Sequence, residues 1–334
     1  MAVTIRRLPA DKERTLVVRA EDVTSPIHGM APQNRTLEDL LKSGIVNVDK
    51  PPGPSSHEVV SWVKRILGVA RAGHSGTLDP KVTGCLPVML GNGTKIAKAL
   101  LTAGKEYVCV MRLHKEVEEE KIRAACAEFV GQIYQRPPLR SSVKRRLRIR
   151  KIYYLDVLEI AGKDVLFRTG CEAGTYIRKL VYDCGEVLGC GAHMAELRRT
   201  RSGPFKEDEK LATLHDLMDA YHFWREDNDT RLISNFLQPI ETGVLHLPKI
   251  IIRDSAVSAL CHGANLAAAG VLQLHSDIKR GDLVAIMTLK GELVATGVAQ
   301  QSAEVITDAK SGIVVDINRV IMTPDVYPKS WQKS

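Results

Sequence analysis

The sequence predicts an α+β protein with a mixed-sheet domain followed by a small β-barrel. Helical and strand patterns follow one another without regular alternation up to about residue 246. From Leu247 the pattern changes to short strands separated by glycine turns, which is typical of a small barrel with hairpins. At 334 residues the chain is long enough for about two domains. We therefore expect an N-terminal extension over 1–44, a larger domain over 45–246 and a barrel over 247–334.

The N-terminal extension is mixed and polar, and Pro26, Gly29 and Pro32 interrupt any periodicity, so we expect it to dock on another part of the molecule. A short strand is predicted over 45–49 and ends at the proline-rich segment 50–54. Ser55 to Glu58 then fits a capping box that begins a helix. Gly68 closes this helix, and its apolar face is formed by Val59, Val60, Val63, Ile66 and Leu67.

Alternation predicts a strand over 106–114, with one face formed by Tyr107, Cys109, Met111 and Leu113. An acidic start favours a helix over 116–130, and strands are predicted over 150–160 and 165–171. Another helix is predicted to start at Gly174–Thr175, with an apolar face formed by Ile177, Leu180, Val181, Cys184 and Leu188. In the barrel, strands over 279–287 and 292–299 flank a turn at Lys290–Gly291.

The charge of the chain favours a polyanionic partner such as nucleic acid. Lys and Arg number 47 against 39 Asp and Glu, which gives a net charge of +8. A run without acidic residues extends from Arg136 to Lys151 and also contains Arg140, Lys144, Arg145, Arg146, Arg148 and Arg150. Such a run suits salt-sensitive phosphate contacts, although a solvated face or a localisation signal has the same composition.

The composition also indicates a compartment. No run of about 18 apolar residues is present, so no membrane span is expected, and residues 1–9 have too little apolar sequence for a secretory signal. Seven cysteines occur without a Cys-x-x-Cys pair. We expect them to be small buried hydrophobic residues in a reducing cytoplasm, with no metal site.

The segment 73–86 carries the strongest chemical signal, because it places Asp79 on a glycine-flanked turn directly before Pro80. An isolated Asp-Pro pair more often caps a helix, and that alternative applies here. Arg178 lies in the first turn of a predicted helix, off its apolar stripe, where a cation opposes the helix dipole. Its guanidinium could align Asp79, or it could be a surface arginine. Tyr107 and Tyr176 could each stack on a base or move a proton, and Tyr107 is equally well explained as strand core.

Five motifs in order resemble the TruB-type pseudouridine synthases: DKPPGPSSH (49–57), GHSGTLDP (73–80), KEY (105–107), GTYIR (174–178) and HMAELRRT (193–200). More narrowly, QRPPLR (135–140), VKRR (143–146) and RSGPF (201–205) resemble the dyskerin branch, which works in H/ACA guide-RNA particles. The resemblance covers about residues 45–326. It implies a mixed-sheet pseudouridine synthase domain, and it favours Asp79 as a nucleophile over a helix cap.

The resemblance implies that a uridine is flipped from RNA into a pocket. Asp79 then assists cleavage of the N-glycosidic bond, the uracil rotates and a carbon–carbon bond forms at C5, with no cofactor. Tyr107 would stack on the base and is a candidate to take the sugar proton, while Arg178 would pair with Asp79. The implied substrate-pocket residues are His74, Tyr176, Leu197 and Lys50. Ser75 departs from the glycine usual in guide-dependent relatives, which puts the substrate fit in question.

Residues 247–327 resemble a PUA domain, which in the guide-dependent branch grips an ACA trinucleotide and carries the N-terminal extension. The matching positions are His262, Gly263, Ala264, Gly270 and Arg280. Apart from the resemblance, ordinary turn glycines explain these positions better. The implied RNA-binding set adds Arg140, Lys144, Arg145 and Arg146. The lack of lysine-rich tails suggests an archaeal-type cytoplasmic protein.

The predicted function is therefore an RNA pseudouridine synthase that acts on rRNA as the catalytic subunit of an H/ACA guide ribonucleoprotein. Its expected partners are guide RNA, substrate RNA (rRNA or tRNA) and small accessory proteins, including a small zinc-ribbon protein and a small β-barrel protein. Two alternatives are a stand-alone enzyme for the T-loop uridine of tRNA and a non-catalytic RNA-binding scaffold. A base-exchanging transglycosylase with a PUA domain fits less well, because that class expects a cysteine-rich zinc site.

Overall fold

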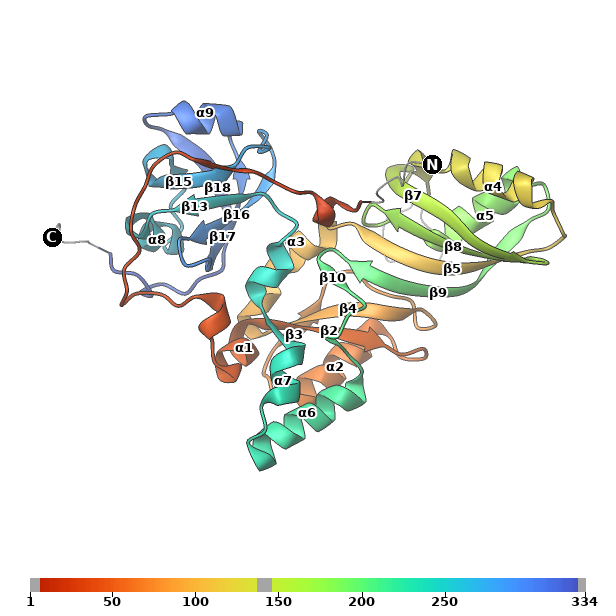
Figure 1. Ribbon diagram of the computed structural model, residues 1–334, viewed down its shortest axis with the longest axis horizontal. Coiled ribbons are helices and arrows are strands. Elements are labelled where there is room, and N and C mark those ends of the chain that lie inside the picture. Colours follow the sequence, from red (N-terminus) through yellow and green to blue (C-terminus); the bar gives the residue numbers. More distant parts are fainter. Residues whose placement is uncertain (1–6, 137–145, 330–334) are drawn as a thin grey trace.

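The computed structural model describes residues 7–136 and 146–329. Strands form two sheets, one of 11 strands and one of 7. The larger sheet extends across the molecule and the smaller one forms a compact body at its end (Figure 1). This arrangement confirms the predicted α+β class with a small C-terminal barrel.

One half of the larger sheet is built on β2 (Gly44–Lys50) and β4 (Thr83–Leu90), which pair antiparallel. Its shorter strands are β3 (Ala72–His74), β11 (Leu211–Ala212) and β12 (Leu237–Pro239). The helices that pack with these strands are α1 (Leu37–Ser43), to their left in Figure 1, and α2 (Ser56–Ile66), α6 (Leu214–Asp227) and α7 (Arg231–Phe236), below them. Their apolar faces bury a shared core with the strands, including Val46, Val59, Val63, Leu86, Leu217 and Ile233.

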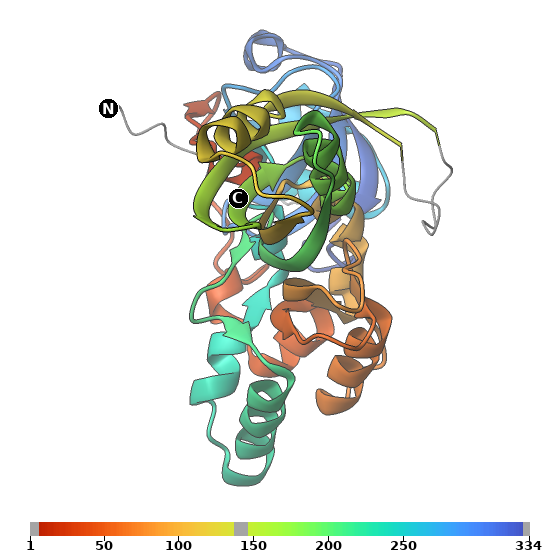
Figure 2. The same cartoon turned by 90° about the vertical axis from the view of Figure 1, so that its right-hand side faces the viewer.

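The other half is an antiparallel series formed by β9 (Ala192–Ser202), β5 (Lys105–Leu113), β8 (Asp164–Cys171), β7 (Arg148–Ala161) and β6 (Gly131–Gln135). Two helices, α4 (Glu119–Glu128) and α5 (Ile177–Val187), pack against it, as the end-on view in Figure 2 shows. The short elements of this domain are η3 (Gly91–Ile96), α3 (Ala97–Thr102), β10 (Phe205–Lys206) and η4 (Ile240–Val244).

The two halves join where β4 runs parallel to β9. Only two residue pairs are in register there, Thr83 with Arg198 and Gly84 with Arg199. Gly84 has φ +100°, and a Cβ at this position would lie 2.2 Å from the carbonyl oxygen of Arg199, so only glycine allows the strands to come this close. This junction brings the loop before β4 next to the middle of β9.

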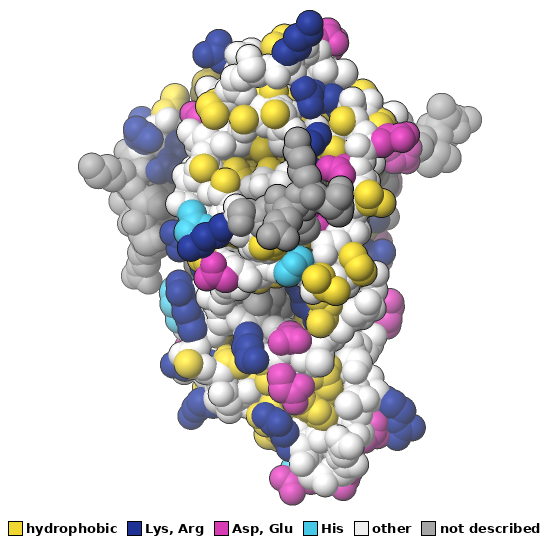
Figure 3. All heavy atoms as spheres, turned by 90° about the vertical axis from the view of Figure 1, so that its left-hand side faces the viewer, with side chains coloured by type: hydrophobic (Ala, Val, Ile, Leu, Met, Phe, Trp, Pro, Cys, Tyr) yellow, Lys and Arg dark blue, Asp and Glu magenta, His cyan; other side chains and the backbone are white. Residues whose placement is uncertain are grey.

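The smaller sheet has the strand order β1–β15–β13–β16–β17–β18–β14. Its strands are β1 (Leu16–Val18), β13 (Lys249–Ile252), β14 (Leu266–Ala267), β15 (Val271–His275), β16 (Leu283–Thr288), β17 (Leu293–Ala299) and β18 (Ile313–Val320). They enclose a core with α8 (Asp254–Cys261), α9 (Ala303–Asp308) and η5 (Ala268–Gly270). The face in Figure 3 shows cations and anions interspersed around hydrophobic side chains.

The N-terminal extension, which contains η1 (Pro9–Asp11) and η2 (Pro32–Asn34), runs around the barrel before it reaches α1 (Figure 1). Its strand β1 pairs antiparallel with β15. Asp254 of the barrel accepts hydrogen bonds from the Thr24 hydroxyl and the Ser25 amide, and Glu292 accepts one from the Met30 amide. The limits at 44 and 246 stay predictions.

Several elements predicted from the sequence are confirmed. The Ser55 hydroxyl accepts a hydrogen bond from the Glu58 amide, and the Glu58 carboxylate accepts one from the Ser55 amide, as a capping box requires. In β5 every second residue from Lys105 to Leu113 is buried. All seven cysteines are unpaired thiols, and only Cys190 is partly exposed.

Two details of the prediction are wrong, and the alternative of a helix cap at Asp79 is excluded. The Val82 amide donates to the Asp79 carbonyl at 2.9 Å in a tight turn that leads into β4, so no helix starts at Pro80 and Asp79 caps none. The helix expected from Gly174 begins at Ile177, because the Gln135 side chain binds both the amide and the carbonyl of Tyr176 and holds it extended. The helix expected over 116–130 is limited to α4.

Candidate active site

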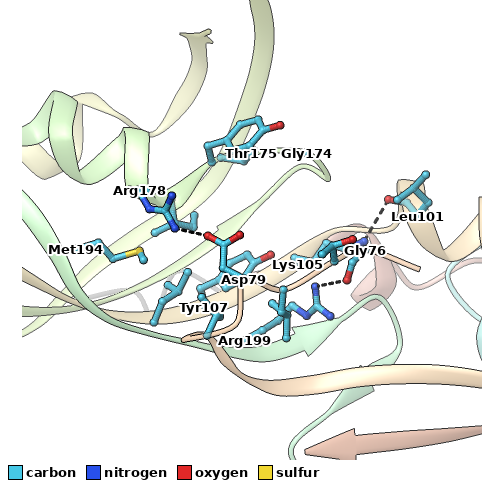
Figure 4. A pocket seen from close by; sticks show the side chains of 16 residues that line it. Gly76, Asp79, Leu101, Lys105, Tyr107, Gly174, Thr175, Arg178, Met194 and Arg199 are labelled. Atoms are coloured by element: carbon cyan, nitrogen blue, oxygen red, sulfur yellow. Dashed lines mark hydrogen bonds and ion pairs between the residues drawn. The ribbon is translucent and has the colours of Figure 1, made fainter. Parts of the chain in front are cut away.

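A cavity of about 500 Å³ opens at the junction of the two half-sheets (Figure 4). The loop before β4, strands β5 and β9, and the start of α5 contribute its walls. Most of the predicted catalytic and pocket residues line it, namely Asp79, Tyr107, Tyr176, Arg178 and Leu197. Residues from four separate segments therefore meet at one hollow in the surface.

Asp79 and Arg178 form the central interaction of this cavity. An Nη2 hydrogen of Arg178 is donated to Oδ2 of Asp79, and both side chains remain just over half exposed, at 55% and 56%. Arg178 is the second residue of α5, off the apolar face of that helix as predicted. The pair combines an aligned carboxylate with access from solvent, which is what a group that attacks an external substrate needs.

The loop that carries Asp79 is fixed from behind. The Ser56 hydroxyl accepts a hydrogen bond from the Leu78 amide and donates one to the Leu78 carbonyl. Lys50 is fully buried. Its ammonium group donates hydrogen bonds of 2.9 Å to the carbonyl oxygens of Pro51, Pro80 and Val82. Burial lowers the pKa of Lys50. Lys50 was expected in the substrate pocket, but it does not line the cavity and instead holds the Asp79 turn in shape.

Tyr107 projects from β5 into the cavity wall and is only 9% exposed. Burial raises the pKa of its phenol, and the nearby Arg199 guanidinium acts in the opposite direction. The hydroxyl is therefore neutral at neutral pH. Its ring is part of the cavity wall, a place that suits stacking on a planar ligand.

His74 and Ser75 lie in the segment leading to Asp79 but do not line the cavity. The His74 ring packs edge-on against His57, with 5.0 Å between ring centroids. Burial first, then His57, lowers the pKa of His74 to about 4, so the ring is neutral at neutral pH. Ser75 is buried, and its hydroxyl has no protein partner among the described residues.

Two buried cations of the cavity wall, Lys105 and Arg199, were not among the predicted site residues. Lys105 and Arg199 both line the cavity and are 4% and 1% exposed. A signal for Lys105 existed, because it lies two residues before Tyr107 and so shares the inward face of β5. Arg199 likewise lies two residues after Leu197 on β9. Neither residue was predicted to belong to the site, because an alternating strand pattern does not predict buried charges.

The predicted RNA-binding residues of the barrel lie far from this cavity in the chain. His262, Gly263 and Ala264 are exposed at the end of α8, and Gly263 has φ +93° with open space around it. Arg280 is exposed in the turn before β16. Gly270 is buried, and a Cβ there would lie 3.1 Å from atoms of Ala256 and Leu266, so it serves packing inside the barrel.

The basic run between β6 and β7 lies partly outside the described residues. Arg140, Lys144 and Arg145 lie outside the described residues, and Arg146 is exposed just before β7.

Across residues 7–136 and 146–329, every helix is too short or too polar to cross a membrane. In the same two ranges, no three His, Cys, Asp or Glu side chains are grouped to hold a metal ion.

Comparisons with protein families assign both the part of the chain that holds the cavity and the small barrel. Residues 64–177 match the TruB family pseudouridylate synthase N-terminal domain, and 178–245 match the tRNA pseudouridylate synthase B C-terminal domain. Residues 248–321 match the PUA domain and 6–60 match the DKCLD domain.

Similarity to known proteins extends over nearly the whole chain. Probable tRNA pseudouridine synthase B of Thermococcus kodakarensis is 60% identical over 98% of this chain and 97% of its own length, and that of Methanopyrus kandleri is 57% identical over 98% and 96%. A chain in the crystal structure of a Cbf5-Nop10-Gar1 complex is 57% identical, with a TM-score of 0.94 over 97% of this chain and 99% of that one.

A chain in the structure of an H/ACA RNP bound to a substrate RNA containing 2′-deoxyuridine is 54% identical, with a TM-score of 0.92 over 98% of this chain and all of that one. The chain therefore belongs to the TruB family of pseudouridine synthases, isomerases that act on uridine. The resemblance seen in the sequence motifs is confirmed, and so is the prediction of an enzyme.

Proposed function

We propose that this protein is the catalytic subunit of an H/ACA guide ribonucleoprotein and that it converts selected uridines of rRNA to pseudouridine. The observation that carries the proposal is the Asp79–Arg178 pair in an open cavity on a chain that keeps the extension and barrel. The full-length similarity to chains in a Cbf5-Nop10-Gar1 complex and in an H/ACA RNP supports guide dependence.

In this proposal each cavity residue has a defined role. Asp79 assists cleavage of the N-glycosidic bond, and Arg178 orients it. Tyr107 stacks on the flipped base, while Tyr176 and Leu197 form the pocket walls. Lys50 and His74 support the loop from behind rather than contact the base.

RNA would be held mainly outside the cavity. We assign the exposed turn at 262–264 and Arg280 to guide-RNA contacts, and the basic run with Arg140, Lys144, Arg145 and Arg146 to phosphate contacts. The partners are then guide RNA, substrate RNA, a small zinc-ribbon protein and a small β-barrel protein. We also propose that the chain divides into the extension 1–44, the catalytic domain 45–246 and the PUA domain 247–334.

A second candidate function is stand-alone modification of the T-loop uridine of tRNA. The names of the curated relatives favour it, since they are described as probable tRNA pseudouridine synthase B. The chemistry at Asp79 would be the same in both cases. Only the way in which the target uridine is selected would differ.

The two functions are separated by assaying one protein preparation in two ways. We expect the protein assembled with guide RNA and accessory proteins to form pseudouridine only at the uridine that the guide specifies. Changing the guide sequence should move the modified position. Efficient modification of tRNA by the protein alone, with no guided activity, would instead establish the stand-alone function.

A further inference from the structure

Buried positive charge collects beneath the cavity. Lys50, Lys105 and Arg199 are 0%, 4% and 1% exposed, and among the described residues none of them forms an ion pair with a carboxylate. The carboxylate of the cavity, Asp79, is paired with Arg178. Burying a charge without a partner lowers the stability of a protein, so these three buried cations need an explanation.

Two of the three cations have a structural reason. The ammonium group of Lys50 donates to three carbonyl oxygens around the Asp79 turn. The ammonium group of Lys105 donates to three carbonyls at the end of α3. The donor–acceptor distances are 3.0 Å to Leu100, 3.2 Å to Leu101 and 2.7 Å to Ala103. Each uses all three of its hydrogens on the backbone.

Arg199 is different because one of its nitrogens is left over. Its Nε donates to the Cys85 carbonyl over 2.7 Å and its Nη1 donates to the Gly76 carbonyl over 3.1 Å. Its Nη2 is buried and has no backbone carbonyl or carboxylate partner among the described residues. The polar group nearest in register is the Tyr107 phenol, whose pKa the Arg199 guanidinium lowers. Two carbonyls thus fix the guanidinium, while its positive charge is left without a negative partner.

Arg199 lies in the wall of the cavity, where its positive charge acts on a bound base. Arg199 on β9 is in register with Tyr107 on β5, so their side chains are cross-strand neighbours in the cavity wall, as Figure 4 shows. Its guanidinium acts on the whole site: after burial itself, it is the next cause that lowers the pKa of Lys105, to about 7. A cation held this way is poised for an anion that appears inside the cavity.

The reaction generates such an anion in the route where Asp79 acts at the sugar and not at the base, and the inference takes that route. When the C1′–N1 bond breaks, its electron pair leaves with the base, so uracil carries one negative charge and the sugar carries the matching positive charge beside the Asp79 carboxylate. After the ring turns, C5 supplies the electron pair of the new bond to C1′, and the hydrogen of C5 is finally replaced by one on N1. Atoms and charge balance without a co-reactant.

We propose that Arg199 stabilises the negative charge on uracil between these two bond changes, as a fixed cation in the cavity wall. This inference rests on the pseudouridine synthase activity of the family and adds a residue to it. Preorganised donors aimed at developing charge typically contribute about 10²–10³-fold in rate. Arg199 therefore belongs to the reaction itself, in addition to its hold on the Asp79 loop through Gly76.

The test compares uridine with 5-fluorouridine at the target position of the same RNA. Fluorine withdraws electrons and makes uracil a more stable anion, so the fluorinated base depends less on a protein cation. We expect Arg199→Met to slow the single-turnover formation of the carbon-linked product about 100-fold or more for uridine and about 10-fold or less for 5-fluorouridine. Arg199→Lys, which restores the charge, should recover part of the uridine rate.

Lys50→Met is the matched control, because it also removes a buried cation but one with a purely structural role. It should slow both RNAs by the same factor. Equal losses for the two RNAs in Arg199→Met would overturn the proposal and leave Arg199 as a loop support. If Arg199→Met does not fold, the comparison is made with Arg199→Gln, which keeps a donor for the backbone carbonyls, and the same outcome decides.

Discussion

Asp79 lines the cavity from a turn whose shape depends on two residues outside the cavity lining, Lys50 and Ser56. Ser56 binds both backbone groups of Leu78, and Lys50 binds the carbonyls of Pro51, Pro80 and Val82. The carboxylate is therefore exposed while the backbone that carries it is buried and hydrogen-bonded. This division lets an open group keep a fixed position.

Replacing Lys50 by Met should destabilise the fold and misplace Asp79. The side chain is nearly the same length, but the buried Val82 carbonyl would lose its donor, at a cost of about 1–3 kcal/mol for a group left unsatisfied, and the Pro51 and Pro80 carbonyls would each lose a hydrogen bond. We expect a free energy of unfolding lower by about 2–5 kcal/mol in denaturant titrations, together with a large loss of activity. Arg178→Lys serves as the comparison, because it should lower activity with little change in stability. An unchanged unfolding midpoint for Lys50→Met would contradict the role of Lys50 as a clamp.

The residues proposed to react were easier to select from the sequence than those that support them. The turn alone favoured a helix cap, and the motif resemblance selected Asp79 as the nucleophile. The place of Arg178 at a helix start gave a further hint. The contact of Asp79 with Arg178 joins residues 99 positions apart, and no local pattern encodes it. The contact depends on the approach of β4 to β9, which in turn depends on Gly84. Lys50 was expected in the pocket, since a motif lists residues without saying which side of the chain they occupy.

At the scale of elements, three parts of the chain meet at His246. This residue follows η4 and precedes β13, and its ring Nε2 lies 3.1 Å from the Ala99 carbonyl on α3. The carbonyl of His246 accepts a hydrogen bond from Arg14 of the extension over 3.0 Å. The ring is buried, which is the main reason why the pKa of His246 falls to about 4. Lys105 and Arg14 add to this shift.

This junction predicts a loss of stability in mild acid. The folded pKa of His246, about 4, lies below the ordinary value of 6.5, so the unfolded chain binds more protons between these two pH values. The stability contributed by the neutral ring is present above pH 6.5 and is lost as the pH falls towards 4. His74 contributes in the same direction and window.

We expect the free energy of unfolding of His246→Gln to depend less on pH between 6.5 and 4 than that of the unchanged protein. His215→Gln is the control, since that histidine is exposed and should leave the pH dependence as it was. Equal slopes for all three proteins would show that His246 is not held neutral by burial.

Secondary structure was predicted best where one face alone is buried. The alternation in β5 and the capping box of α2 matched the structure closely. Prediction failed where a distant side chain decides the backbone, as at Tyr176, which Gln135 keeps out of α5. The turn at Pro80 was not predicted for a related reason. Its shape depends on Lys50, which lies 30 positions earlier and binds the carbonyl of Pro80.

At the scale of the whole molecule, the proposed chemistry and the proposed RNA contacts lie in separate bodies. The cavity lies in the larger sheet, while the barrel and the extension wrapped around it offer exposed turns away from that sheet (Figure 1). Buried contacts such as Ile45, Met89, Ala285 and Leu293 fasten the two bodies together. A guide RNA held by one body could then present a uridine to the other at a fixed distance. The change to short strands and glycine turns at Leu247 predicted a separate small barrel, but not the buried contacts that join it to the larger sheet.

The central claim is that the Asp79 carboxylate performs the chemistry in this cavity. The most direct measurement is single-turnover pseudouridine formation by Asp79→Asn, with RNA affinity measured on the same preparation. Asparagine keeps the size of the side chain but cannot act as a nucleophile, so we expect unchanged folding, RNA affinity within about threefold and no detectable product. Product formation at a rate close to that of the unchanged protein would contradict the account.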